Sequence, residues 1–258
     1  MFLRTALWHY LVVAPHVFLL GVLVVLLQGR LYRQHPLFFT YVIYEIISFP
    51  FLLFLIFSRS VAEPQYEIFS AIVLAGSGFV RFGVIYELYS HLSKTYPSLE
   101  KFCKFLFRGL TAVLLFISVT LVALVWPGRT HELTRFITYV LDRGVNILQV
   151  GLILGLFGIA KFFSLSWRKH VLGITLGFGF YLSVELITTA VQAQWGFVHF
   201  LDYVTMAAYH VSVVIWLYYM WAREESAGHE LGPSLTTIPK HADIDAWNSE
   251  LEKLLNSK

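Results

Sequence analysis

The sequence predicts an all-α, polytopic membrane protein: a bundle of seven transmembrane helices with its N-terminus outside and its C-terminus in the cytoplasm. Composition is the first observation, because 57% of the 258 residues are hydrophobic and only 14% carry a formal charge. The second is that the apolar residues form seven continuous runs of roughly 19–25 residues, the length that a helix needs to cross a bilayer core. The third is the uneven distribution of positive charge between the loops.

The seven expected helices are separated by polar loops, and none shows the alternating pattern of a membrane-spanning strand. A helix satisfies its own backbone hydrogen bonds, which no water can do inside the hydrocarbon region. In chain order we expect the helices at 7–28, 37–57, 68–90, 106–126, 136–160, 171–192 and 203–221. Residues 1–221 therefore form the bundle, and residues 222–258 form a polar tail.

Lysine and arginine are concentrated on one side of the predicted bundle. Thirteen lie in the loops after the first, third and fifth helices and in the tail, against four on the other side. The positive-inside rule then places the tail in the cytoplasm. The first run is long enough to span and lacks a cleavage site. A single cysteine, Cys103, and the lack of an Asn-x-Ser/Thr glycosylation site suit a bacterial inner membrane.

The net charge of +3 is spread over several loops, so the composition does not predict a nucleic-acid partner. The expected partners are the lipid bilayer and another protein chain. In the tail, Ile244, Trp247, Leu251 and Leu254 recur at helical spacing. This pattern predicts an amphipathic helix at about 243–256 that can dock on a partner.

Ionisable residues inside the predicted spans are the candidate functional residues, because burying an unpaired charge in lipid costs several kcal/mol. With a rise of about 1.5 Å per residue, one layer lies roughly 9–13 Å below the outer surface. Its members are Asp142, Arg143, Glu185, His210 and His16. Roughly 12–14 Å from the inner surface, Glu45 and Arg81 are expected to form an ion pair, structural or part of a proton relay.

The fifth expected helix has two different faces. At 100° per residue, Asp142, Asn146 and Gln149 line one side. The opposite side carries glycines at 144, 151, 155 and 158, a small-residue ridge that permits close helix approach and predicts a possible homo-oligomer contact. Arg143 lies 100° from Asp142 and is expected to reach Glu185 or another acidic neighbour.

The predicted buried charges do not balance. Three acids, Glu45, Asp142 and Glu185, face two arginines, Arg81 and Arg143. Either one carboxyl is protonated, or a histidine is charged, or a cation binds. The alternative interpretation is that the expected pairs, Arg143 with Glu185 and Glu45 with Arg81, only fix the packing of the helices.

Known seven-helix families were compared by their functional residues. The last helix, YVTMAAYHVSVVIWLYYMW, has no lysine for a retinal Schiff base, and its single His210 is not the His-x-x-x-His of intramembrane zinc hydrolases. The stretches LYRQHPLFFTYVIYEI, SWRKHVLGITLGFGFYLSVEL and DAWNSELEKLL resemble uncharacterised seven-helix membrane proteins of acidobacterial type. That resemblance implies the topology and a bacterial origin, and it implies no activity.

Four functions remain open from the sequence. The favoured one is a binding or sensor-like protein whose buried layer takes a ligand, ion or proton and whose tail contacts a separate chain. The others are a proton-coupled transporter or channel, a structural subunit of a membrane complex, and a protein holding haem between His16 and His210. No catalytic residues, metal ligands or cofactor are predicted, and an enzyme is the less favoured class.

Overall fold

The computed structural model describes residues 2–57, 63–95, 101, 104–105, 107–113, 116, 120, 133–162, 167–195 and 199–222, although not the side chains of 2–5, 56–57, 63–64, 67, 93–95, 133–143, 193–194 and 199. Every regular element in these ranges is helical, and the ranges hold no strand. The helices are α1 (Phe2–Gln28), the short 3-10 helix η1 (Leu31–Arg33), α2 (Pro36–Phe57), α3 (Glu63–Thr95), α5 (Leu133–Phe162), α6 (Lys169–Trp195) and α7 (His199–Trp221).

The prediction of a helical membrane bundle is confirmed. Six helices of the described part are long and apolar enough to cross a membrane. Of the expected fourth helix, 106–126, the structure describes residues 107–113, 116 and 120, and of the tail, 222–258, only residue 222. Residues 107–113 are helical, and the ring of Phe107 lies 5.1–5.5 Å from those of Phe82, Tyr86 and Tyr89 in α3. The seventh span and the orientation in the membrane stay predictions.

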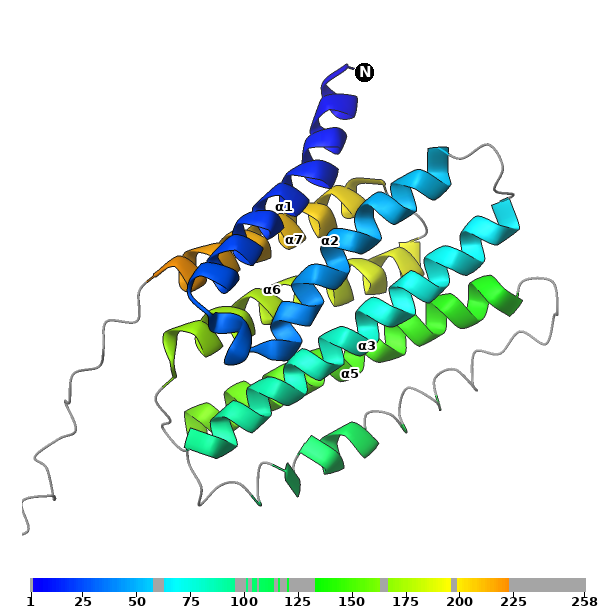
Figure 1. The fold of residues 1–258 in the computed structure, drawn as a ribbon. Helices are drawn as coiled ribbons and strands as arrows, with labels where there is room; N and C mark the ends of the chain where they lie inside the picture. The colour runs from blue at the N-terminus through cyan, green and yellow to red at the C-terminus, as the bar shows by residue number, and fades with distance from the viewer. Residues whose placement is uncertain are drawn as a thin grey trace, which may run out of the picture. The chain divides into compact units, whose positions relative to one another are not determined.

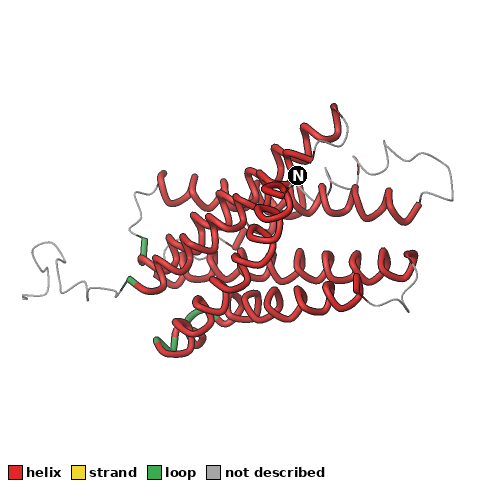
Figure 2. The backbone as a smooth tube through the Cα atoms, turned by 90° about the horizontal axis from the view of Figure 1, so that it is seen from above, coloured by secondary structure: helices red, strands yellow, loops and turns green. Residues whose placement is uncertain are grey.

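Neighbouring helices follow one another around the bundle. α1 packs on α2, α2 on α3, α3 on α5, α5 on α6, α6 on α7, and α7 returns to α1 (Figure 1). A direct contact between α3 and α6 crosses the middle of this ring. α1 rises more steeply than α2, α3, α5 and α6 (Figure 1), and the view from above shows that the helices pack side by side and that some cross the others obliquely (Figure 2). The polar faces of α2, α3 and α6 can therefore meet inside the bundle.

A ladder of contacts fixes α6 against α7 along their whole length. Two aromatic residues of α7, Trp216 and Tyr219, pack against Gly177 and Gly173 of α6. Hydrogen bonds join the same two helices at 2.9–3.3 Å: His170 Nδ1 to the Tyr219 carbonyl, Trp216 Nε1 to the Ile174 carbonyl, Thr188 to Thr205, and Gln192 to Asp202.

Trp216 also anchors the aromatic core. Its ring is fully buried and lies 4.8–5.8 Å from the rings of Phe38, Tyr41 and Phe178. Aromatic pairs at these separations stabilise a core beyond the area that they bury. Because Gly177 has no side chain, the indole can lie directly on the backbone of α6.

We predict that Gly177→Ala destabilises the protein by about 1–3 kcal/mol, because the added methyl would overlap the rigid, buried indole of Trp216. Thermal unfolding of the detergent-purified protein measures the effect. Gly158→Ala is the matched control, since nothing lies within 4 Å of its added methyl and alanine is the better helix former. Equal melting temperatures for the two variants would contradict this packing.

Candidate functional site

A cavity of about 460 Å³ opens between five helices, towards the end of the bundle where α2 ends and α3 begins. Its size is within the usual range of small-molecule sites. Most of its wall is apolar or hydroxylic, and the residues able to titrate or to donate strong hydrogen bonds are His16, Tyr41, Glu45, Arg81, Tyr181, Glu185 and Tyr209. It is the one described cavity that holds several candidates predicted from the sequence.

An ion pair between α3 and α6 forms one wall of this cavity. Arg81 Nη1 lies 3.3 Å from Glu185 Oε2, and these side chains are only 5% and 13% exposed. The other carboxylate oxygen of Glu185 accepts a hydrogen bond from the Tyr181 hydroxyl at 2.9 Å. The Arg81 guanidinium also lies 6.0 Å from the centre of the Tyr181 ring. Both oxygens of Glu185 are therefore engaged, and its charge is compensated.

Glu45 of α2 forms a different kind of contact. Its Oε1 accepts a hydrogen bond from Ser77 Oγ at 2.5 Å, and no described residue forms an ion pair with it. Ser77 lies one helical turn before Arg81 on α3, so the two acids contact successive turns of the same helix. The cavity therefore contains two carboxyl groups and one guanidinium, and the described contacts assign the guanidinium's ion pair to Glu185 and not to Glu45.

His16 presents one ring nitrogen to the cavity. Its Nδ1 lies 2.8 Å from the Val12 carbonyl oxygen, which can only accept, so Nδ1 carries the proton and Nε2 keeps its lone pair. The imidazole stacks on Phe49 with ring centres 3.7 Å apart. The stacking fixes the orientation of the ring at the cavity wall.

The structure changes the predicted partner of Arg81. The sequence predicts a pair with Glu45, whereas Arg81 binds Glu185 and Glu45 binds Ser77. The two predicted layers also merge into one site. The reason is helix length: α3 and α6 extend beyond the predicted spans, so that Glu45, Arg81 and Glu185 all lie near the middle of their helices.

His210 lies apart from this cavity. Its ring is 5.1 Å from Phe18 and 5.5 Å from Tyr10, both in α1, and its Nε2 is 3.5 Å from the Tyr10 hydroxyl. The structure therefore brings His16 and Glu185 to one cavity and places His210 against α1.

The polar stripe of α5 is partly described. Gln149 is fully buried and donates through Nε2 to the Gly78 carbonyl of α3 at 2.8 Å. Asn146 is 4% exposed, and within the described part of the chain neither polar atom of its amide has a hydrogen-bond partner. The side chains of Asp142 and Arg143 lie outside the described residues, so the contact expected between Arg143 and Glu185 stays untested.

The glycine ridge of α5 packs partly within the chain. A methyl group on Gly155 would lie 2.9 Å from both Leu110 and the Tyr89 hydroxyl, whereas Gly158 has open space. Gly155 thus permits a close approach to α3 and to the segment after it. The predicted homo-oligomer contact concerns the part of the ridge that these residues leave open.

Ser77 and three tyrosines, Tyr41, Tyr181 and Tyr209, belong to the site but were not among its predicted residues. A spacing of four residues separates Ser77 from Arg81 and Tyr181 from Glu185, and such pairs face the same way on a helix. That spacing is the signal that identifies two of them in the sequence. Tyr41 and Tyr209 read as ordinary core aromatics, and no sequence pattern separates them from the others.

A scan against protein-family models and searches of the curated proteins and of the solved structures find no match to this chain. The class that the fold and cavity define is a multi-pass helical membrane protein with a charged cavity inside its bundle.

We predict that Arg81→Met and Glu185→Leu each destabilise the fold by about 3–5 kcal/mol, because each leaves one buried charge without its partner. The double variant should lose much less than the sum of the two. Reversible unfolding in mixed micelles gives the three free energies. Additive losses would show that the two residues do not stabilise each other.

Proposed function

We propose that this protein is a membrane-embedded binding protein whose cavity takes a small ligand bearing one positive charge. The observation that carries the proposal is the excess of carboxyl groups in the cavity: Glu45 and Glu185 share one arginine, and among the described residues Glu45 has no ion pair of its own. An ionised carboxylate inside a bundle needs an opposite charge, or it takes up a proton instead. A bound cation would supply that charge beside the carboxyl, and the empty protein would hold a proton there.

The remaining wall of the cavity suits an organic cation better than a bare metal ion. Phe49, Tyr41, Tyr181 and Tyr209 offer aromatic faces or hydroxyls, and cations are attracted to the faces of such rings. Ser48, Ser70 and Ser77 add hydroxyl groups on the α2–α3 side. A volume of about 460 Å³ leaves room for a ligand larger than an ion.

Binding at this place supports a sensor-like role. The cavity is lined by α1, α2, α3, α6 and α7, so a ligand that neutralises Glu45 would favour whichever packing of these helices closes around it. α7 leads directly into the polar tail at Ala222. We propose that the tail, on the cytoplasmic side of a bacterial inner membrane, reports the bound state to a separate chain.

The proton-coupled transporter is the second candidate, and the geometry favours it less. That hypothesis needs ionisable stations at two depths, and the sequence assigns the outer one to Asp142, Glu185 and His210 and the inner one to Glu45 and Arg81. Glu185 of the outer station lines the same cavity as Glu45 and Arg81. A single site agrees better with binding than with a relay between stations.

We predict that tetramethylammonium raises the melting temperature of the wild-type protein and not that of Glu45→Gln. Ligand at one hundred times its dissociation constant stabilises the folded state by about 2.7 kcal/mol. The measurement is thermal unfolding in detergent, with sodium chloride at equal ionic strength as the reference. Native mass spectrometry of untreated protein would reveal a ligand that is retained during purification.

Asp202→Asn is the matched control for that experiment, because Asp202 is a carboxylate of α7 that binds Gln192 away from the cavity. It should respond to tetramethylammonium as the wild type does. An equal response of the wild type and Glu45→Gln would refute a cation site at Glu45. A melting temperature that depends on pH only when Glu45 is present, with no effect of tetramethylammonium, would favour the proton-coupled alternative.

A further inference from the structure

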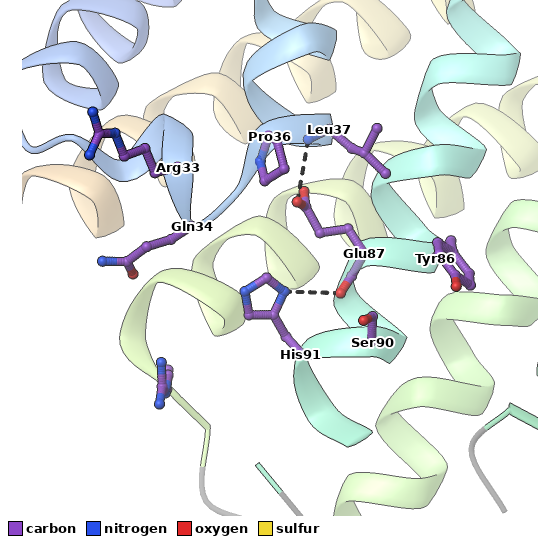
Figure 3. Close-up of a pocket in the computed structure, with 9 residues that line it drawn as sticks. Arg33, Gln34, Pro36, Leu37, Tyr86, Glu87, Ser90 and His91 are labelled. Atoms are coloured by element: carbon purple, nitrogen blue, oxygen red, sulfur yellow. Dashed lines mark hydrogen bonds between the residues drawn. The ribbon is translucent and has the colours of Figure 1, made fainter. Parts of the chain in front are cut away.

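A second cavity, of about 390 Å³, lies at the opposite end of the bundle (Figure 3). It is bounded by the link between α1 and α2, by the last turns of α3 and by the start of α6. Its wall includes two arginines, Arg33 and Arg168, together with Glu87 and His91. None of these residues contributes to the cavity that holds Glu45.

Glu87 and His91 of this cavity wall form, together with the neighbouring His35, a set with the chemistry of metal ligands. One potential ligand atom from each of His35, Glu87 and His91 lies within 4.8 Å of the other two. His35 and Glu87 are only 2% and 6% exposed. The two imidazole rings lie 4.6 Å apart, with planes inclined by 31°. Buried imidazoles are unusual beside a carboxylate unless hydrogen bonds or an ion hold them together.

Glu87 is held in place by backbone hydrogen bonds. Its two carboxylate oxygens accept hydrogen bonds from the backbone N–H groups of Leu37, at 3.3 Å, and Phe38, at 3.0 Å, in the first turn of α2 (Figure 3). These N–H groups have no partner within their own helix, and the helix dipole favours a negative charge there. A carboxylate oxygen that accepts one hydrogen bond still has a lone pair for a metal ion.

The two histidines are also prepared to act as ligands. His91 Nδ1 lies 3.0 Å from the main-chain carbonyl oxygen of Glu87 and must donate to it, which leaves the lone pair on Nε2. A hydrogen bond of this kind fixes the orientation of metal-binding histidines. Nδ1 of His35 is buried and has no hydrogen-bond partner among the residues that the structure describes.

We propose that His35, Glu87 and His91 bind one divalent transition-metal ion of the zinc type. Two imidazoles and one carboxylate are a frequent protein ligand set for Zn²⁺, and they leave a fourth position open. The adjacent arginines, Arg33 and Arg168, favour water in its hydroxide form or an anion at that position. The metal ion would then be a partner for the buried Nδ1 of His35, which has none among the described residues.

The pattern that identifies this set is short and divided. Glu87 and His91 lie four residues apart on α3, and His35 follows the first helix more than fifty residues earlier. Neither the Glu87 and His91 spacing nor His35 is distinctive alone, so no metal ligands are predicted from the sequence. In the folded chain the start of α2 packs against the last turns of α3, and this contact brings His35 next to Glu87 and His91.

We predict that the chelator-treated protein in detergent binds one Co²⁺ per chain, with visible absorption bands of a nitrogen- and oxygen-coordinated ion, and that Zn²⁺ displaces it. His35→Gln and His91→Gln should each weaken Co²⁺ binding at least tenfold. Glu87→Gln should also weaken it while keeping an oxygen that accepts from the first turn of α2, so its melting temperature separates lost metal binding from lost folding.

His170→Asn is the control variant, because His170 lies nearby on α6 and already donates to the Tyr219 carbonyl. It should bind Co²⁺ like the wild type. Wild-type affinity in both folded variants His35→Gln and His91→Gln would overturn the proposal, as would the absence of saturable Co²⁺ binding by the wild type. Binding of inorganic phosphate alone, with no Co²⁺ site, would identify an anion pocket formed by the arginines and would equally overturn it. Glu45→Gln leaves this site intact, so the two proposals can fail separately.

Discussion

The buried ion pair between Arg81 and Glu185 is the interaction on which the arrangement of the bundle depends. It joins α3 to α6, two helices that face each other across the ring rather than along it. Neither charge could remain in this low-dielectric interior alone, so the pair fixes the rotation of both helices about their axes. The hydroxyl of Tyr181 adds a second constraint on the same carboxylate. Once these two faces are set, Ser77 is directed towards α2 and the acidic residue there has to accept its hydrogen bond.

The cavity follows from that constraint together with the aromatic core beneath it. Trp216, Phe38 and Phe178 fill the centre of the bundle, and Tyr41 belongs to both the core and the cavity wall. Above these rings, smaller residues of α2 and α3 leave space that no side chain of the described part fills. Polar groups thus lie against a rigid aromatic floor, which limits how far they can rearrange when the cavity is occupied.

Helix positions could be predicted from the sequence because twenty consecutive apolar residues have few alternatives in a membrane. α2 begins at Pro36 and ends at Phe57, within one residue of the prediction. α3 extends further at both ends, since helices continue past the lipid wherever polar residues tolerate them. The partners of Arg81 and His210 could not be predicted in the same way. Depth along a helix follows from counting residues, whereas the direction of a side chain around the axis depends on which helices are neighbours. The expected role of Asp142 and Arg143 stays a prediction.

The ladder between α6 and α7 restricts how any change at Glu185 can reach the end of the chain. Its contacts run from His170 and Tyr219 at one end to Gln192 and Asp202 at the other, and Trp216 lies on the backbone of α6 between them. Sliding one helix past the other by a single residue, about 1.5 Å, would disrupt this register along its whole length. A piston movement of α7 is therefore strongly opposed. The same contacts would permit a tilt or rotation of α6 and α7 together, which keeps their register and moves the last turn of α7 sideways rather than along its axis.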